Sequence, residues 1–310
     1  MLFLISMLLF PGASFQGAST GLLLWFHNVL PNLLPFIILS NLMVRLNISK
    51  KLSKLFYPVL GRIFRISCEG CYPIIIGFLS GIPMGAKTTS DLVSEHKISS
   101  REGQFLIGMC NNASPMFIIG YIAITQLKLP HFNYILFGII YGSAIISALL
   151  YRFLVDLLSK KSNITEKTII ATSSDNRNGR FSFALLDSSI MNGFEIVTKI
   201  GGYIILFSIV AQIIKGIGPD TSFIKAFIMG LFEITTGISQ ICNTPMDVNT
   251  KIVLVTAITS FGGLSGLAQT KSVMGDTRLS IYSYVIVKLL SALLSMLFAW
   301  IYLTLFPIMN

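Results

Sequence analysis

Two long apolar stretches of the sequence are interrupted by small and polar residues. The first interruption covers residues 110–115 (Cys-Asn-Asn-Ala-Ser-Pro) and the second covers residues 260–266 (Ser-Phe-Gly-Gly-Leu-Ser-Gly). Each is predicted to break a membrane helix at bilayer depth. Unpaired backbone groups cost several kcal/mol in hydrocarbon, so a break is tolerated only where protein or a water-filled cavity satisfies it. Matched breaks in the two halves of a chain indicate a transporter's binding site.

The composition is that of a polytopic membrane protein. Hydrophobic residues make up 53% and charged residues 12% of the 310 residues, whereas a soluble domain has about 25% charged residues. A span needs about 20 mostly apolar residues, and we predict plain spans at residues 30–46, 132–154, 199–214 and 281–306. Residues 1–10 are apolar but lack the basic n-region of a signal peptide. We favour a short first membrane helix there over a cleaved signal.

The charge is strongly basic, with 23 Lys and Arg against 13 Asp and Glu and a formal net charge of +10. The basic residues concentrate in residues 45–65, 87–101 and 152–180. By the positive-inside rule these segments are cytoplasmic. No nucleic-acid-binding motif accompanies them. The basic segments are therefore expected to contact the lipid bilayer and not nucleic acid.

The two halves of the chain are predicted to repeat the same elements in opposite orientation, as in inverted-repeat transporters. The predicted fold class is an all-α polytopic membrane protein with two re-entrant helical hairpins, two broken transmembrane helices and about six full spans. Residues 49–66 and 183–197 are predicted to be amphipathic helices. If either hairpin instead crosses the membrane, the orientation of every later segment in the membrane is reversed. The predicted parts are a first repeat at 1–158 (hairpin 70–95, broken helix 101–126), a cytoplasmic linker at 159–182 and a second repeat at 183–310 (hairpin 222–243, broken helix 250–275).

The first hairpin and the first break supply one group of candidate substrate-binding residues. Pro83 and its flanking glycines end one helix and start another, and the free N–H groups of a half-helix attract anions. Lys87 adds a charge there, or else its head group extends to lipid phosphate. The amides of the break bind substrate or hydrogen-bond neighbouring helices. The candidates are Gly81, Gly85, Lys87, Thr88, Asn111, Asn112 and Ser114.

The second hairpin and the second break supply the other group. An ionisable residue inside a membrane segment is a functional hypothesis by default, so Glu233 is predicted to couple a cation or a proton. Pairing with Lys225 or Lys251 is the alternative. The glycines of the second break let substrate approach the backbone closely, or else they let helices pack tightly. The substrate-binding candidates are Thr235, Thr236, Gly262, Gly263, Ser265 and Gln269.

An enzyme is not expected. The three histidines cannot form a Ser-His-Asp set, and no phosphate-binding loop is present. Cys68 and Cys71 form a lone C-x-x-C without further ligands at workable spacing, and packing is the favoured role for both. The sequence therefore predicts no catalytic residue, no metal site and no cofactor, apart from a coupling cation or proton.

Four stretches together resemble the YlbJ-type sporulation integral membrane proteins, within the Gate or nucleoside-recognition group. They are residues 81–87, 110–120, 233–237 and 260–265, and Ile82 and Leu267 depart from the pattern. The resemblance implies a fold related to concentrative nucleoside transporters and a role in endospore formation. It also implies a location in the outer forespore membrane and transport of dipicolinic acid from mother cell towards forespore.

The hypothesis from residues and resemblance together is a transporter of a small polar or anionic solute, with dipicolinic acid as the expected substrate. One alternative is a carrier of nucleosides or other small molecules with the same fold. Another is a sporulation membrane scaffold that transports nothing. The expected protein partners are further copies of the chain or other sporulation membrane proteins.

Overall fold

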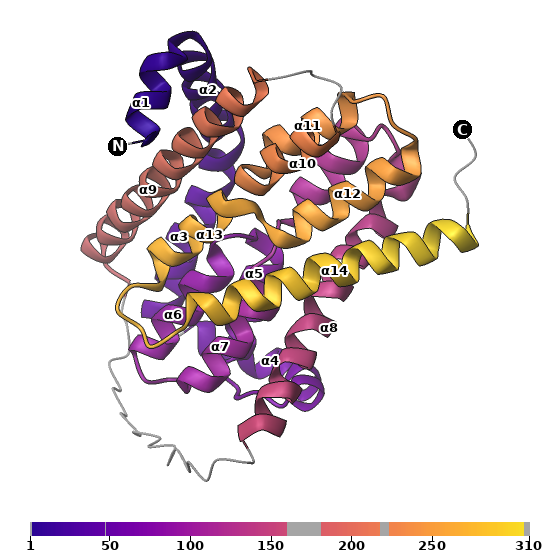
Figure 1. The fold of residues 1–310 in the computed structure, drawn as a ribbon. Helices are drawn as coiled ribbons and strands as arrows, with labels where there is room; N and C mark the ends of the chain where they lie inside the picture. Colours follow the sequence, from indigo (N-terminus) through magenta and orange to yellow (C-terminus); the bar gives the residue numbers. More distant parts are fainter. Residues whose placement is uncertain (1, 47, 160–180, 218–222, 307–310) are drawn as a thin grey trace.

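The computed structural model describes residues 2–46, 48–159, 181–217 and 223–306, and every regular element in these ranges is a helix (Figure 1). The predicted all-α class is confirmed for this part of the chain. The predicted linker at 159–182 lies almost wholly outside it. In chain order the elements are α1 (Leu2–Leu9), α2 (Pro11–Leu24), η1 (Trp25–Val29), α3 (Leu30–Arg45), α4 (Ile48–Phe64), α5 (Cys71–Ser80), α6 (Met84–Ser94), α7 (Ser100–Cys110), η2 (Phe117–Gln126), η3 (Pro130–Phe132), α8 (Asn133–Ser159), α9 (Phe183–Lys215), α10 (Phe223–Phe232), α11 (Ile234–Asn243), α12 (Val248–Phe261), α13 (Gly263–Met274) and α14 (Ile281–Leu305).

Four helical stretches are long and apolar enough to cross a membrane: Pro130–Leu158, Phe183–Lys215, Val248–Met274 and Ile281–Leu305. A fifth candidate is α3 continued by α4, a pair bent by 92°. The chain is thus a multi-pass membrane protein with four or five candidate spans, and the predicted count of about six is not confirmed. The predicted first helix is α1, whose 8 residues cover about 12 Å and cannot cross the bilayer alone.

Helix α9 corrects the predicted division of its region. The sequence predicts an amphipathic helix at 183–197 and a separate span from residue 199, but α9 runs unbroken through both. Lys199 Nζ lies 2.7 Å from Glu195 Oε1, an i,i+4 ion pair that bridges the predicted boundary and favours helix. At 1.5 Å per residue the helix is about 50 Å long, so it extends beyond a hydrocarbon core of about 30 Å.

Helix α4 has the features predicted for an interfacial helix at 49–66. It lies nearly at right angles to α3, and its small residues Ser49 and Ser53 are buried against the protein. Leu55, Val59 and Ile63 are 72%, 59% and 62% exposed. An apolar stripe that faces away from the protein, on a helix that also carries several lysines, fits contact with lipid at the membrane surface.

Two pairs of short helices lie where the hairpins are predicted, α5 with α6 and α10 with α11. Each helix has 10 or 11 residues and covers about 15 Å, half the hydrocarbon thickness. In both hairpins two glycines meet where the helices cross. A Cβ atom built on Gly77 would lie 2.9 Å from the Cα atom of Gly85, and one on Gly237 would lie 2.1 Å from the Cα atom of Gly230. The lengths and the tight crossings fit re-entrant elements.

Helix α2 was not predicted, and it packs beside α9 through two glycines (Figure 1). A Cβ atom on Gly17 would lie 2.6 Å from the Cα atom of Ile209, and one on Gly21 would lie 2.8 Å from the Cα atom of Ile205. Small residues four apart let two helix backbones approach closely within a membrane. The signal in the sequence was this glycine spacing.

Replacing Gly17 or Gly21 by leucine should separate α2 from α9. Overpacking of this kind costs about 1–3 kcal/mol, so the midpoint of thermal unfolding in detergent should fall. Gly12→Leu is the matched control on the same helix, because a Cβ atom there meets nothing within 4 Å. Equal midpoints for Gly12→Leu and Gly21→Leu would contradict the packing.

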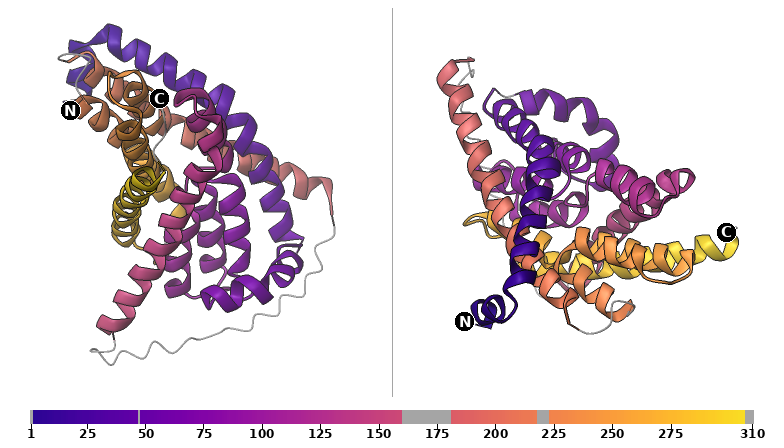
Figure 2. Two further views of the ribbon diagram at one scale, coloured as in Figure 1. Left: turned by 90° about the vertical axis from the view of Figure 1, so that its right-hand side faces the viewer. Right: turned by 90° about the horizontal axis from the view of Figure 1, so that it is seen from above.

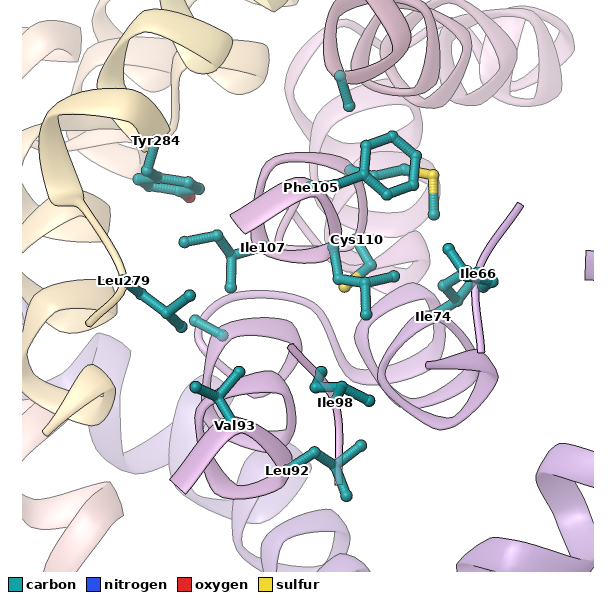
Figure 3. Packing of buried hydrophobic residues seen from close by; sticks show 14 of the residues in the cluster. Ile66, Ile74, Leu92, Val93, Ile98, Phe105, Ile107, Cys110, Leu279 and Tyr284 are labelled. Atoms are coloured by element: carbon teal, nitrogen blue, oxygen red, sulfur yellow. The ribbon is translucent and has the colours of Figure 1, made fainter. Parts of the chain in front are cut away.

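A cluster of buried side chains holds the first hairpin and α7 against the start of α14. Figure 3 shows Ile74 from α5, Val93 from α6, Ile107 from α7 and Tyr284 from α14 within this cluster. The cluster includes Cys110, the last residue of α7. The end of α7, directly before the first break, is therefore part of this packed cluster. Farther along, α14 lies beside α12, as the right-hand view of Figure 2 shows.

Candidate functional site

A cavity of about 410 Å³ lies where the two hairpin tips and the two broken helices meet. Its volume and its few converging polar groups are typical of a small-molecule site. The residues that line it are Leu24, Val29, Leu33, Ser80, Ile82, Ala113, Ser114, Met116, Phe117, Gly120, Tyr121, Thr125, Ile204, Glu233, Ile234, Thr235, Gly262, Ser265, Gly266 and Gln269. Six of the predicted site residues are among them: Ser114, Glu233, Thr235, Gly262, Ser265 and Gln269.

The tip of the first hairpin is bonded to the first break through backbone groups. Ile82 N donates to Asn112 O at 2.7 Å. Gly81 has φ +81°, and a Cβ atom there would lie 2.6 Å from Ser114 N. A glycine is required at this point, both for its conformation and for the close approach of the two backbones.

Asn111 joins three helices. Its Oδ1 accepts a hydrogen bond from Ala86 N at 3.2 Å, and its Nδ2 donates to Thr270 Oγ1 and to Tyr284 OH, both at 2.9 Å. The side chain is completely buried. Its amide therefore connects α6, α13 and α14, which is the structural alternative raised from the sequence.

Asn112 contacts Lys288, which is not among the predicted site residues. Lys288 Nζ donates to Asn112 Oδ1 at 2.5 Å, and Asn112 Nδ2 donates to Met109 O at 2.7 Å. Lys288 is 1% exposed and lies on α14, a region predicted as a plain span. A lysine within so apolar a segment was the available signal, because charged groups inside membrane helices are rare and functional.

Glu233 forms the tip of the second hairpin and caps α11. Its carboxylate accepts hydrogen bonds from Thr235 N at 3.1 Å, from Thr236 N at 2.7 Å and from Thr236 Oγ1 at 2.9 Å. The residue is 3% exposed and lines the cavity. The N-terminus of α11, where a negative charge is stabilised, is thus already occupied by a carboxylate of the chain itself.

The second break contacts both hairpin tips. Gly262 is left-handed, with φ 86° and ψ 0°, and a Cβ atom there would lie 3.3 Å from Ile82 Cδ1 of the first hairpin. A Cβ atom on Gly263 would lie 3.1 Å from Ile234 Cγ2 of the second hairpin. The four interruptions of the sequence therefore converge on one place.

Several groups in the cavity wall can recognise a ligand. Ser80 is 7% exposed, and its Oγ has no hydrogen-bond partner among the described residues. Phe117 and Tyr121 stack with ring centroids 5.0 Å apart, and Tyr121 OH donates to Thr235 O at 3.1 Å. A buried hydroxyl without a partner costs free energy and indicates an unfilled bonding position.

The chain is 26% identical over 315 residues to the sporulation integral membrane protein YlbJ of Bacillus subtilis (strain 168). The match covers 93% of this chain and 77% of that protein. This similarity supports a YlbJ-type assignment. No protein-family model matches the chain, and no solved structure matches it.

The four stretches that carried the YlbJ-type resemblance all contribute to the cavity wall. Residues 81–87 supply Ile82, and residues 110–120 supply Ser114, Phe117 and Gly120 among others. Residues 233–237 supply Glu233, Ile234 and Thr235, and residues 260–265 supply Gly262 and Ser265. Stretches far apart in the sequence thus form one cavity, and Ile82 is part of it.

Eight predicted substrate-binding residues do not line the cavity: Gly81, Gly85, Lys87, Thr88, Asn111, Asn112, Thr236 and Gly263. Lys87 Nζ lies 2.5 Å from Asp91 Oδ2, one turn along α6. Thr88 Oγ1 donates to Met84 O at 2.8 Å within the same helix. These contacts satisfy both side chains within α6, so neither presents a free group to the cavity.

The formal charge of the cavity wall is negative. Among the residues of the described chain that line it, Glu233 supplies a carboxylate and none is Lys, Arg or His.

Within the described residues no group of three His, Cys, Asp or Glu side chains could hold a metal ion. Cys68 lies outside the candidate spans, and burial raises the pKa of its thiol above the ordinary value. A thiol with a raised pKa is a poor nucleophile.

Proposed function

We propose that the chain is a sporulation membrane transporter that binds one small polar solute in the cavity between its hairpin tips. The observation that carries the proposal is the convergence of two hairpins and two broken helices on one cavity whose few polar groups include an unpartnered Ser80 hydroxyl. Discontinuous helices that meet near the midplane are the usual architecture of secondary-transporter sites. The role in sporulation follows the name of the YlbJ relative.

An inverted repeat is part of this proposal. The elements α5, α6, α7 and α8 have counterparts in α10, α11, α12 and α14 in the same order. The glycine crossing recurs in both hairpins, at Gly77 with Gly85 and at Gly230 with Gly237. Two hairpins of half-bilayer length, each followed by a broken helix and a span, support the two-repeat topology. The outer forespore membrane is the proposed location.

Dipicolinic acid is the first candidate solute. Its flat ring suits the stacked pair Phe117 and Tyr121, and Ser80, Ser114 and Gln269 offer hydrogen-bonding groups around it. Its two carboxylates require neutralisation beside Glu233, since no cationic side chain of the described chain lines the cavity. Dipicolinate is therefore expected to bind together with a divalent cation.

A nucleoside is the second candidate solute, and the charge of the cavity favours it. A nucleoside is uncharged, so it can lie beside the Glu233 carboxylate without a counter-ion. Its base can stack on Phe117 or Tyr121, and its ribose hydroxyls can reach serine and glutamine side chains. Binding without added cation distinguishes this candidate from dipicolinate.

Ligand-dependent thermal stabilisation tests the proposal. A ligand at 100 times its Kd stabilises the folded state by about 2.7 kcal/mol, so dipicolinate with Ca²⁺, dipicolinate alone and uridine should be compared on purified protein. Gly120 lines the cavity, and a Cβ atom there meets nothing within 4 Å. A leucine side chain at this position should therefore occupy the cavity without displacing protein atoms, so Gly120→Leu should abolish the stabilisation by ligand. Gly202→Leu, equally unobstructed on α9, should retain it. No stabilisation of the wild type by any of the three would overturn the proposal.

A further inference from the structure

Lys288 is buried in the interior of the helix bundle. It lies on α14, a candidate span, and is 1% exposed. Its Nζ donates to Asn112 Oδ1 at 2.5 Å and lies 5.5 Å from the ring centroid of Tyr284. The helices α7, α8, α12 and α13 pack against α14.

The surroundings of Lys288 compensate its charge poorly. An ammonium group has three donors, and the described side chains give it one hydrogen bond and no carboxylate partner. The titratable groups near it are the Cys110 thiol of α7 and the Tyr284 phenol of α14, and the Tyr141 phenol of α8 interacts with Cys110. The buried residues of α12 and α13 include no titratable side chain.

A residue of this kind is costly for stability. An isolated buried charge is strongly unfavourable, and replacing buried ionic groups by well-packed apolar side chains is often neutral or stabilising. Methionine would fill nearly the same volume without the charge. The single hydrogen bond to Asn112 offsets little of this cost, which favours a role for the lysine beyond packing.

Short contacts connect Lys288 to the cavity wall. Its hydrogen bond orients Asn112, whose backbone oxygen accepts from Ile82 N at 2.7 Å. Ile82 lines the cavity and packs over Gly262, while Ala113 and Ser114 line it directly after Asn112. A change in the charge of Lys288 alters its bond to Asn112 and thereby acts on the first hairpin tip.

We propose that Lys288 is a proton-binding site linked to occupancy of the cavity. This inference rests on the proposed function. The neutral amine accepts one proton from water to become an ammonium, which donates to Asn112, and it returns that proton to water when the bond to Asn112 is released. No other bond forms or breaks, and no further reactant is needed. The coupling ion is then a proton on Lys288, while Glu233 caps α11.

Calorimetry of ligand binding tests the linkage. Binding of uridine or of dipicolinate with Ca²⁺ is measured at one pH in buffers of different ionisation enthalpy, which gives the protons exchanged per ligand. The wild type should exchange a clear fraction of one proton, and Lys288→Met should exchange none. Lys199→Met, which removes an exposed lysine of α9, is the control and should behave as the wild type. Binding without proton exchange in the wild type overturns this inference and leaves the proposed function intact.

Unfolding without ligand supplies an independent readout. Lys288→Met should be folded, and the difference between its unfolding midpoint and that of the wild type should change with pH, because a titrating group makes stability depend on pH. A difference that stays constant across the accessible pH range shows that Lys288 does not titrate and overturns the inference. If the wild type binds neither probe, the proposed function and this inference fail together.

Discussion

Gly81→Ala is expected to destabilise the protein by several kcal/mol and to distort the cavity wall. The residue has φ 81° and ψ −162°, a region that is essentially restricted to glycine, where a side chain costs about 1–3 kcal/mol. A Cβ atom would also lie 2.6 Å from Ser114 N and 2.9 Å from Ser114 Cα. Backbone atoms cannot rotate away as a flexible side chain does, so overpacking adds about 1–3 kcal/mol. Thermal unfolding of the purified protein measures the loss.

Two matched variants separate the two causes of this loss. Gly275→Ala places a side chain at φ 55° and ψ −145°, where nothing lies within 4 Å, so it carries the conformational cost alone. Gly85→Ala lacks the unusual φ but would place Cβ 2.6 Å from Cys110 O, so it carries the steric cost alone. The loss for Gly81→Ala should exceed both. A loss no larger than that of Gly275→Ala would show that the first tip and the first break are not in contact.

The interruptions could be predicted from the sequence because their causes are local. Proline at 83 and 115 and glycine at 81 and 262 restrict or permit particular backbone conformations whatever surrounds them. The structure places each helix end at or next to these residues. Apolar length likewise predicted the spans at α8 and α14.

The contents of the cavity could not be predicted, because they depend on which faces of distant helices meet. Lys87 was a reasonable anion ligand in sequence, yet Asp91 lies one turn away on the same face and pairs with it. Asn112 meets Lys288, which is 176 positions distant in the chain. The unbroken course of α9 also depends on tertiary packing, since its glycines at 201 and 202 permit a break without requiring one.

Glu233→Ala should reduce stability and abolish ligand binding together. The carboxylate accepts three hydrogen bonds at the start of α11. Loss of an N-cap costs about 0.5–2 kcal/mol, and leaving buried donors unsatisfied costs about 1–3 kcal/mol. Glu233, Ile234 and Thr235 all line the cavity. If the start of α11 unwinds, part of the cavity wall is therefore lost as well. Glu233→Gln keeps one acceptor oxygen, so it should lose less stability than alanine.

Asp247→Ala is the control for capping alone. Asp247 caps α12 with the same chemistry, accepting from Thr250 N at 2.8 Å and from Thr250 Oγ1 at 2.6 Å, but it is exposed and does not line the cavity. Hydrogen bonds from Thr250 lower the pKa of Asp247, so this cap is ionised at neutral pH. Asp247→Ala should therefore lose some stability while retaining ligand-dependent stabilisation. If Glu233→Ala also retained it, the second tip would not form part of the binding site, and the cavity would have to bind its solute through the first tip and the breaks alone.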